Sequence, residues 1–138
     1  MLFPYKDDNP RVLVPYVTYA IISINVLIFV LQLNMAMVNS SIEREFIYKF
    51  GFIPANFSFF TMFTSMFLHG GFSHIFGNMW FLWVFGDNVE GILGHIKFGI
   101  FYLLCGLVAT MSQLFVNPES TIPMVGASGA IAGVLGMY

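Results

Sequence analysis

The sequence predicts an all-α protein, a polytopic transmembrane helical bundle that forms a single membrane domain over residues 1–138. Charged residues make up 9% of the chain, against roughly 25% in ordinary soluble domains, and hydrophobic residues make up 58%. Seventeen Phe, nine Met and a mean hydropathy of +0.82 would leave a water-soluble surface with too little polar cover. Long apolar runs then divide the chain into spans and loops.

The first three expected spans lie at residues 15–33, 72–86 and 98–116. The first holds nineteen residues without a charge, close to the ~20 needed to cross a ~30 Å hydrocarbon core. It is too long for a signal peptide and no small-residue cleavage site follows it, so we expect it to be retained. The second carries His74 and Asn78 and is expected to close with a polar turn at residues 86–91. The third lies between Lys97 and Asn117-Pro118.

Residues 36–71 are expected to form an interfacial loop rather than a span. Ser40-Ser41-Ile42-Glu43 resembles a capping box, and apolar residues recur at helical spacing until Gly51. Charged residues occupy the other positions, which predicts a short helix lying in the membrane interface. Residues 57–68 are mostly apolar but too short to cross, and they predict a surface-embedded or re-entrant segment.

The last apolar run, residues 126–138, is a partial span that opens with Gly126-Ala127-Ser128-Gly129. Flanking glycines let a ligand approach the backbone around Ser128. If a helix begins here, the free N–H groups of its first turn face whatever the serine attacks. Taken alone, the four residues fit a small-residue contact between membrane helices better than they fit a catalytic serine.

His74 and Asn78 are polar side chains inside an apolar run, which is costly in a bilayer and needs an explanation. Their i, i+4 spacing places them on one face of a helix. The pair alone is best explained by a hydrogen bond between helices. Both side chains are also good donors to the developing negative charge of a tetrahedral intermediate, and with Ser128 they form a constellation. His69 lies five residues before His74, which is poor spacing for a shared face, and His95 is expected in a loop.

Charges indicate the orientation and exclude some functions. Three positive charges are expected on the side of the N-terminus and two on the other side: Lys6, Arg11 and Lys97 against Arg44 and Lys49. We therefore expect the N-terminus in the cytoplasm and Ser128 toward the outer side. The net charge of −2 argues against a nucleic-acid partner. Since no HExxH or comparable spacing occurs, neither a metal nor a cofactor is predicted.

Between residues 67 and 136, three segments follow in order: FLHGGFSHIFGNMWFLWVFGDNVEGILGH, FGIFYLLCGLVA and PMVGASGAIAGVLG. Together they resemble the rhomboid family of intramembrane serine proteases. The resemblance implies a six-helix core of which this chain is the N-terminal part, ending within the fourth transmembrane helix. It implies that Ser128 of the Gly126 to Gly129 motif is the nucleophile and that His74 and Asn78 stabilise the oxyanion. The backbone N–H groups of Ser128 and Ala127 would complete the oxyanion hole.

Two features depart from the family pattern. The catalytic histidine of rhomboids lies on the sixth helix, and nothing in this chain supplies it, so we expect a fragment or shortened product that is inactive alone. The alternative is that His69 or His74 acts as the base, although His74 would then be lost as an oxyanion donor. The Trp-Arg pair of the first rhomboid loop is not evident either, because Arg44 is flanked by two glutamates.

The predicted function is that of an intramembrane serine endopeptidase that cleaves transmembrane segments of membrane proteins. A proteolytically inactive rhomboid-like protein that binds client helices is the alternative, and a plain helical scaffold is the third hypothesis. The expected location is the bacterial cytoplasmic membrane, with the bilayer and membrane-protein substrates as partners. Neither the substrate nor the oligomeric state follows from the sequence.

Overall fold

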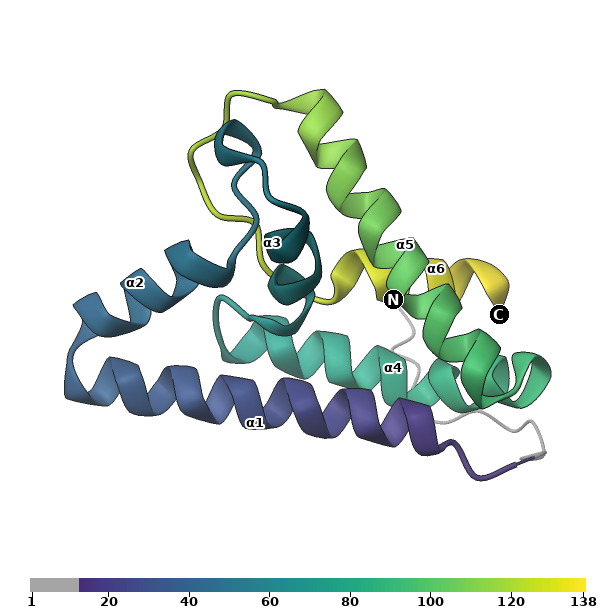
Figure 1. Ribbon diagram of the computed structural model, residues 1–138. Coiled ribbons are helices and arrows are strands. Elements are labelled where there is room, and N and C mark those ends of the chain that lie inside the picture. The colour runs from purple at the N-terminus through teal and green to yellow at the C-terminus, as the bar shows by residue number, and fades with distance from the viewer. Residues whose placement is uncertain (1–12) are drawn as a thin grey trace.

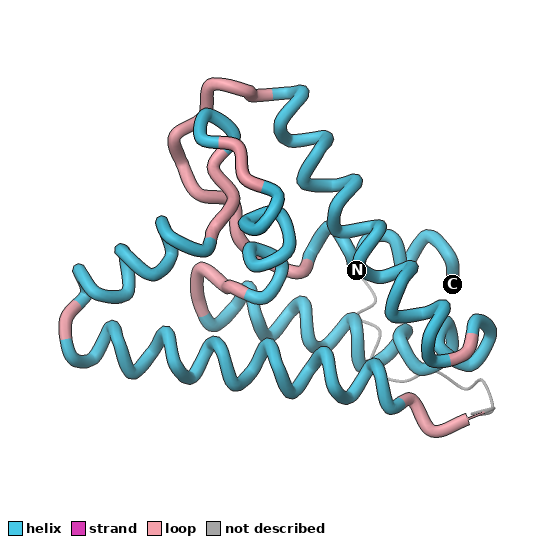
Figure 2. Tube along the Cα trace, viewed as in Figure 1, coloured by secondary structure: helices cyan, strands magenta, loops and turns pink. Residues whose placement is uncertain are grey.

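The structure of the chain, a computed structural model, describes residues 13–138 and contains no strand in that range (Figures 1 and 2). It confirms the all-α prediction. The elements, with η for short 3-10 helices, are α1 (Tyr16–Val38), α2 (Ser40–Phe50), η1 (Pro54–Asn56), α3 (Phe59–Thr64), η2 (Ser65–Phe67), α4 (Phe72–Leu93), α5 (His95–Val116) and α6 (Ser128–Met137).

The long helices form the frame of the molecule. Helices α1 and α4 lie side by side along the lower edge of Figure 1, and α5 rises from the end of α4. Helix α6 packs mainly on α5 and also on α4. The short helices η1, α3 and η2 lie beside residues 117–127, the loop that leads into α6. Backbone hydrogen bonds from the loop to residues 52, 55 and 65 therefore fix the segment before Ser128 to the short helices.

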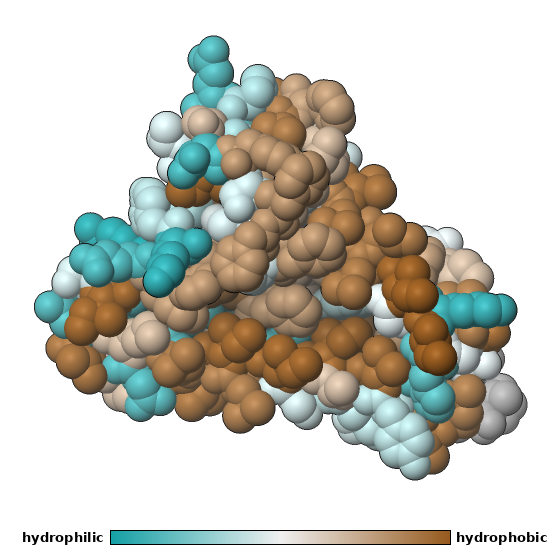
Figure 3. All heavy atoms as spheres, in the orientation of Figure 1, coloured by the Kyte–Doolittle hydropathy of each residue, from teal (hydrophilic) through white to brown (hydrophobic). Residues whose placement is uncertain are grey.

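Two of the described helices, α1 and α5, are long and apolar enough to cross a bilayer. Apolar side chains cover much of the face seen in Figure 3, whereas polar side chains gather over α2. Helix α4 is of similar length but carries His74, Asn78 and Glu90, so its expected span stays a prediction. Lys6 and Arg11, on which the expected orientation partly depends, lie outside the described residues.

Three local expectations are wrong. Helix α4 does not close with a polar turn at residues 86–91 but continues to Leu93. His95, expected in a loop, is the first residue of α5. The third concerns the start of α2, where a capping box beginning at Ser40 was expected. The N-cap is instead Asn39, whose side chain accepts from Ser41 N–H at 2.9 Å.

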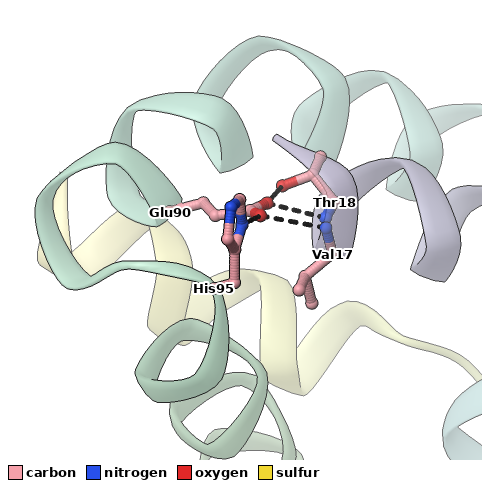
Figure 4. Close-up of polar contacts among 4 residues, drawn as sticks. All are labelled: Val17, Thr18, Glu90 and His95. Carbon is pink, nitrogen blue, oxygen red and sulfur yellow. Dashed lines mark hydrogen bonds and ion pairs between the residues drawn. The ribbon is translucent and has the colours of Figure 1, made fainter. Parts of the chain in front are cut away.

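Glu90 explains why α4 continues through a polar sequence. Its carboxylate has no exposed surface and accepts from the backbone N–H groups of Val17 (2.9 Å) and Thr18 (2.8 Å) and from the Thr18 hydroxyl (2.7 Å), as Figure 4 shows. The N-cap residue of α1, Pro15, offers no side-chain acceptor. Glu90 therefore satisfies orphan N–H groups at the start of α1 from a different helix, where a negative charge also suits the helix dipole.

Glycines allow α6 to lie close to α5. A Cβ atom added to Gly129 would lie 2.3 Å from the Ala109 Cβ, and one added to Gly133 would lie 2.3 Å from the Cys105 Sγ. Real Cβ atoms do not approach other atoms so closely, so both positions need glycine. Small residues at such contacts are typical of membrane helices, and here they fix α6, and with it Ser128, against α5.

Candidate active site

Ser128 is the first residue of α6. Gly126, two residues earlier, has φ 122°, a conformation that favours glycine. Ser128 is exposed and lines a cavity of about 110 Å³, whose wall also includes Thr110 and Gln113 of α5. The hydroxyl thus lies at a helix N-terminus, beside free N–H groups, as the sequence predicts for this serine.

The loop that carries Ser128 is fixed by backbone hydrogen bonds to earlier parts of the chain. Phe52 and Met124 exchange two bonds, of 3.0 Å from Phe52 N–H and 2.7 Å from Met124 N–H. Gly126 N–H donates to the carbonyl of Ser65 at 2.9 Å, next to the turn itself. The segment between α1 and α4 therefore positions the turn before Ser128, which is a structural role that its apolar sequence did not reveal.

His74 and Asn78 lie against this turn. A Cβ atom added to Gly126 would lie 2.7 Å from His74 Nε2 and 3.7 Å from Asn78 Nδ2. The imidazole thus occupies the space that a side chain at residue 126 would need. The structure brings together the three predicted site regions, the serine turn and the two polar residues of α4, although they are about fifty residues apart in sequence.

His69 belongs to the same group of side chains. Its Nε2 lies 3.0 Å from Asn78 Nδ2, and its ring meets that of His74 edge to face with centroids 5.2 Å apart. Burial and then the neighbouring His74 lower the pKa of His69 to about 4, and the Phe67 carbonyl opposes this shift. His69 is therefore neutral at pH 7. Helical spacing did not detect this residue because His69 precedes α4 and does not obey its periodicity.

Gln32 of α1 is a residue that sequence reasoning missed. It is buried and bonds both the carbonyl and the backbone N–H of His69. The available signal was an amide inside an apolar span, which is costly in a bilayer unless it has a partner. The partner could not be read from the sequence, because it lies 37 residues away.

The arrangement offers a serine hydroxyl and nearby side-chain N–H groups, and no base among residues 13–138 is hydrogen-bonded to that hydroxyl. Ser128 Oγ makes no hydrogen bond to any of residues 13–138, and His69 Nε2 is occupied by Asn78. Acyl transfer needs a hydroxyl whose proton is taken up by a nearby base. Across the described part of the chain, no group of three or more His, Cys, Asp or Glu side chains could hold a metal ion.

The family described as Rhomboid domain matches residues 56–138. The rhomboid protease GluP of Bacillus subtilis is 32% identical over 123 residues, which is 88% of this chain and 24% of that protein. Putative rhomboid protease YdcA of the same organism is 32% identical over 84 residues, 61% of this chain and 42% of that protein.

A mitochondrial relative aligns with nearly the whole chain. Rhomboid protein 1 of Saccharomyces cerevisiae is 30% identical over 140 residues, covering 99% of this chain and 38% of that protein. The chain thus spans between about a quarter and two fifths of the length of these three relatives. No solved structure gives a significant match.

Proposed function

Since this chain belongs to the rhomboid family, we propose that it carries the nucleophile and the oxyanion donors of an intramembrane serine endopeptidase. The family and the two apolar helices make it part of an integral membrane protein. Its substrates are transmembrane segments of other membrane proteins, in keeping with the relatives named as rhomboid proteases.

In this proposal Ser128 Oγ attacks the carbonyl carbon of a substrate peptide bond and gives its proton to a base. The carbonyl oxygen becomes an oxyanion that accepts hydrogen bonds from His74, Asn78 and the backbone N–H groups of Ala127 and Ser128. Collapse of the intermediate breaks the C–N bond, and the base returns the proton to the departing amine. Water then hydrolyses the acyl-enzyme.

The observation that carries the proposal is the contact of Gly126 with His74 and Asn78. The positions of His74 Nε2 and Asn78 Nδ2, 2.7 and 3.7 Å from a Cβ at residue 126, put two side-chain donors beside the residue that precedes Ala127 and Ser128. A pair that served only to join two helices would not need a glycine turn, a helix N-terminus and an exposed hydroxyl at the same point.

The base is proposed to be a histidine outside residues 1–138. This is supported by the lack of a hydrogen bond from Ser128 Oγ to any described residue and by the greater length of the relatives. The same lack of a base favours one other function, a rhomboid-like protein that binds client helices without cutting them. We rank it second, because a pure binding role gives no reason for the donors to converge on the Ser128 turn.

The location is proposed to be a bacterial cytoplasmic membrane, with the N-terminus in the cytoplasm and Ser128 toward the outer side. Lys6, Arg11 and Lys97 on the expected side of the N-terminus, three positive charges against the two of Arg44 and Lys49 in α2, support this orientation. The relatives include both bacterial and mitochondrial proteins, so the orientation needs its own test.

A cleavage assay tests the proposed function. The complete protein, purified in detergent or reconstituted in liposomes, is mixed with a single-span substrate tagged at both ends. We expect two tagged fragments, and none with Ser128→Ala. Fragments produced equally well by Ser128→Ala would contradict the proposed nucleophile, and an uncut substrate that co-purifies with the protein would favour the client-binding alternative.

A further inference from the structure

A buried glutamine joins α1 to the segment before α4. Gln32 Nε2 donates to the His69 carbonyl at 2.9 Å, and Gln32 Oε1 accepts from His69 N–H at 3.1 Å. Both residues are buried, with exposed fractions of 0% for Gln32 and 1% for His69. His69 lies between η2 and α4, where no helix supplies partners for these backbone groups. The two bonds therefore anchor the backbone of residue 69 to α1.

The anchored residue in turn meets the carboxamide of Asn78. His69 Nε2 lies 3.0 Å from Asn78 Nδ2. Asn78 Nδ2 also lies 3.7 Å from the position that a Cβ atom on Gly126 would occupy. The amino group of Asn78 thus faces both the imidazole and the turn before Ser128. Since an amide nitrogen carries two N–H donors, one can bond His69 while the other remains for a group bound at the turn.

The proton on His69 decides which end of the Asn78 carboxamide faces the ring. A neutral imidazole has one N–H and one acceptor nitrogen. If Nδ1 is protonated, Nε2 accepts from the Asn78 amino group. If Nε2 is protonated, the amide oxygen must face the ring instead. In the structure the amino nitrogen Nδ2 of Asn78 faces Nε2, and because an amino group only donates, Nε2 accepts and the proton lies on Nδ1. Nδ1 itself has no hydrogen-bond partner among the described residues.

We propose that Gln32 and His69 are positioning residues of the oxyanion site: Gln32 anchors His69, and His69 accepts from Asn78 so that amide N–H, and not amide oxygen, faces the substrate carbonyl. The inference rests on the proposed function, because it takes Asn78 as an oxyanion donor. Neither Gln32 nor His69 touches the substrate. Both act through Asn78.

A double-mutant cycle in the complete protein tests this dependence. Asn78→Ala is expected to lower kcat by up to about 100-fold to 1,000-fold, the range for losing one oxyanion donor. His69→Phe removes the acceptor and should lower kcat with little change in KM. The double variant should be no slower than Asn78→Ala alone, since His69 has nothing left to orient. Effects that multiply would overturn the proposal.

Conservative and matched variants separate positioning from general stability. His69→Gln keeps an acceptor oxygen and should recover most of the kcat lost in His69→Phe. Gln32→Met should lower kcat, whereas Asn34→Leu, which replaces an exposed α1 amide that bonds only its own helix, should not. Equal losses of kcat in Gln32→Met and Asn34→Leu would contradict the role of Gln32.

A spectroscopic measurement keeps the test independent of activity. ¹⁵N spectra of the histidine-labelled protein at pH 7, with the signals of residue 69 assigned by their loss in His69→Gln, report which ring nitrogen is protonated. We expect a protonated Nδ1 and an unprotonated Nε2. A protonated Nε2 would overturn the positioning proposal even in an active enzyme. Full activity in Ser128→Ala would instead refute the proposed function and leave the ¹⁵N result to decide the local geometry.

Discussion

His95 Nδ1 lies 2.5 Å from Glu90 Oε1, where the first residue of α5 meets a carboxylate that already accepts from the start of α1. An ionised carboxylate only accepts, so Nδ1 is the nitrogen that carries the proton. His95 is partly exposed, with 42% of its side chain accessible, whereas the Glu90 side chain is fully buried. One carboxylate thus links the start of α1, the end of α4 and the start of α5 (Figure 4).

The first prediction concerns this carboxylate. Glu90→Gln replaces two charged acceptor oxygens by one neutral oxygen and an amino group, which leaves an α1 N–H without its acceptor. We expect the free energy of unfolding to fall by about 1 to 3 kcal/mol, measured by thermal unfolding in detergent. Glu45→Gln, on the exposed side of α2, is the matched control and should change little. Equal melting temperatures of the Glu90→Gln and Glu45→Gln variants would show that Glu90 does not stabilise the start of α1.

A second prediction concerns the turn before Ser128. Gly126→Ala puts a methyl group 2.6 Å from His74 Cε1 at a residue with φ 122°, so the turn or the imidazole must shift. We expect a loss of about 1 to 3 kcal/mol in stability, together with a large loss of kcat in the complete protein. Gly136→Ala is the control, since a Cβ there meets nothing within 4 Å. A fully active Gly126→Ala enzyme would refute the close contact with His74.

The third prediction concerns pH. Since the pKa of His69 is about 4 in the fold and about 6.5 in the unfolded chain, the unfolded state binds a proton first as pH falls. Stability should therefore decrease between about pH 6.5 and pH 4 and level off below the folded pKa. Melting temperatures across this range should show a smaller decrease in His69→Gln. An unchanged pH dependence in that variant would mean that His69 is not buried in its neutral form.

The topology gives a fourth prediction. Because Gly94 joins α4 to α5 and Asn117 follows α5, reporters fused at these two residues should lie on opposite sides of the membrane. We expect a cytoplasmic signal after Gly94 and an external one after Asn117, from enzymatic reporters active on one side only. The reverse pattern would place Ser128 at the cytoplasmic side. Two signals from the same side would show that α5 does not cross.

Sequence patterns predicted the features that depend on near neighbours. The i, i+4 spacing of His74 and Asn78 placed both on one helix face, and the glycines around Ser128 indicated a close-packed helix start. Apolar runs located α1 and α5, although α1 continues five residues beyond its expected end at residue 33 and α5 begins three residues before its expected start at residue 98. Composition together with the long apolar runs was enough to predict the all-α membrane class.

Features that depend on distant partners were not predictable in this way. The sequence predicted that Glu90 belongs to a polar turn. Its partners, the backbone N–H groups of Val17 and Thr18, lie more than seventy residues earlier, and no local pattern indicates that Glu90 accepts from them. The spacing of His69 to His74 did not group it with the two residues of α4, because the helix begins only after His69, and the sequence therefore offered His69 only as an alternative base. The sequence did not indicate a role for Gln32. Its partners are the backbone carbonyl and N–H of His69, and every residue type except proline carries these two groups, so the residue type does not reveal the contact.

The central claim is that Ser128 is a nucleophile that needs a base from outside residues 1–138, and fluorophosphonate labelling tests it most directly. Residues 1–138 and the complete protein are treated side by side, each with its Ser128→Ala variant, and the labelled residue is identified by mass spectrometry. We expect labelling at Ser128 in the complete protein, its loss in Ser128→Ala, and none in residues 1–138, because an unassisted hydroxyl is a weak nucleophile. Labelling of Ser128 in residues 1–138 would contradict the claim and would point to His69 or His74 as the base.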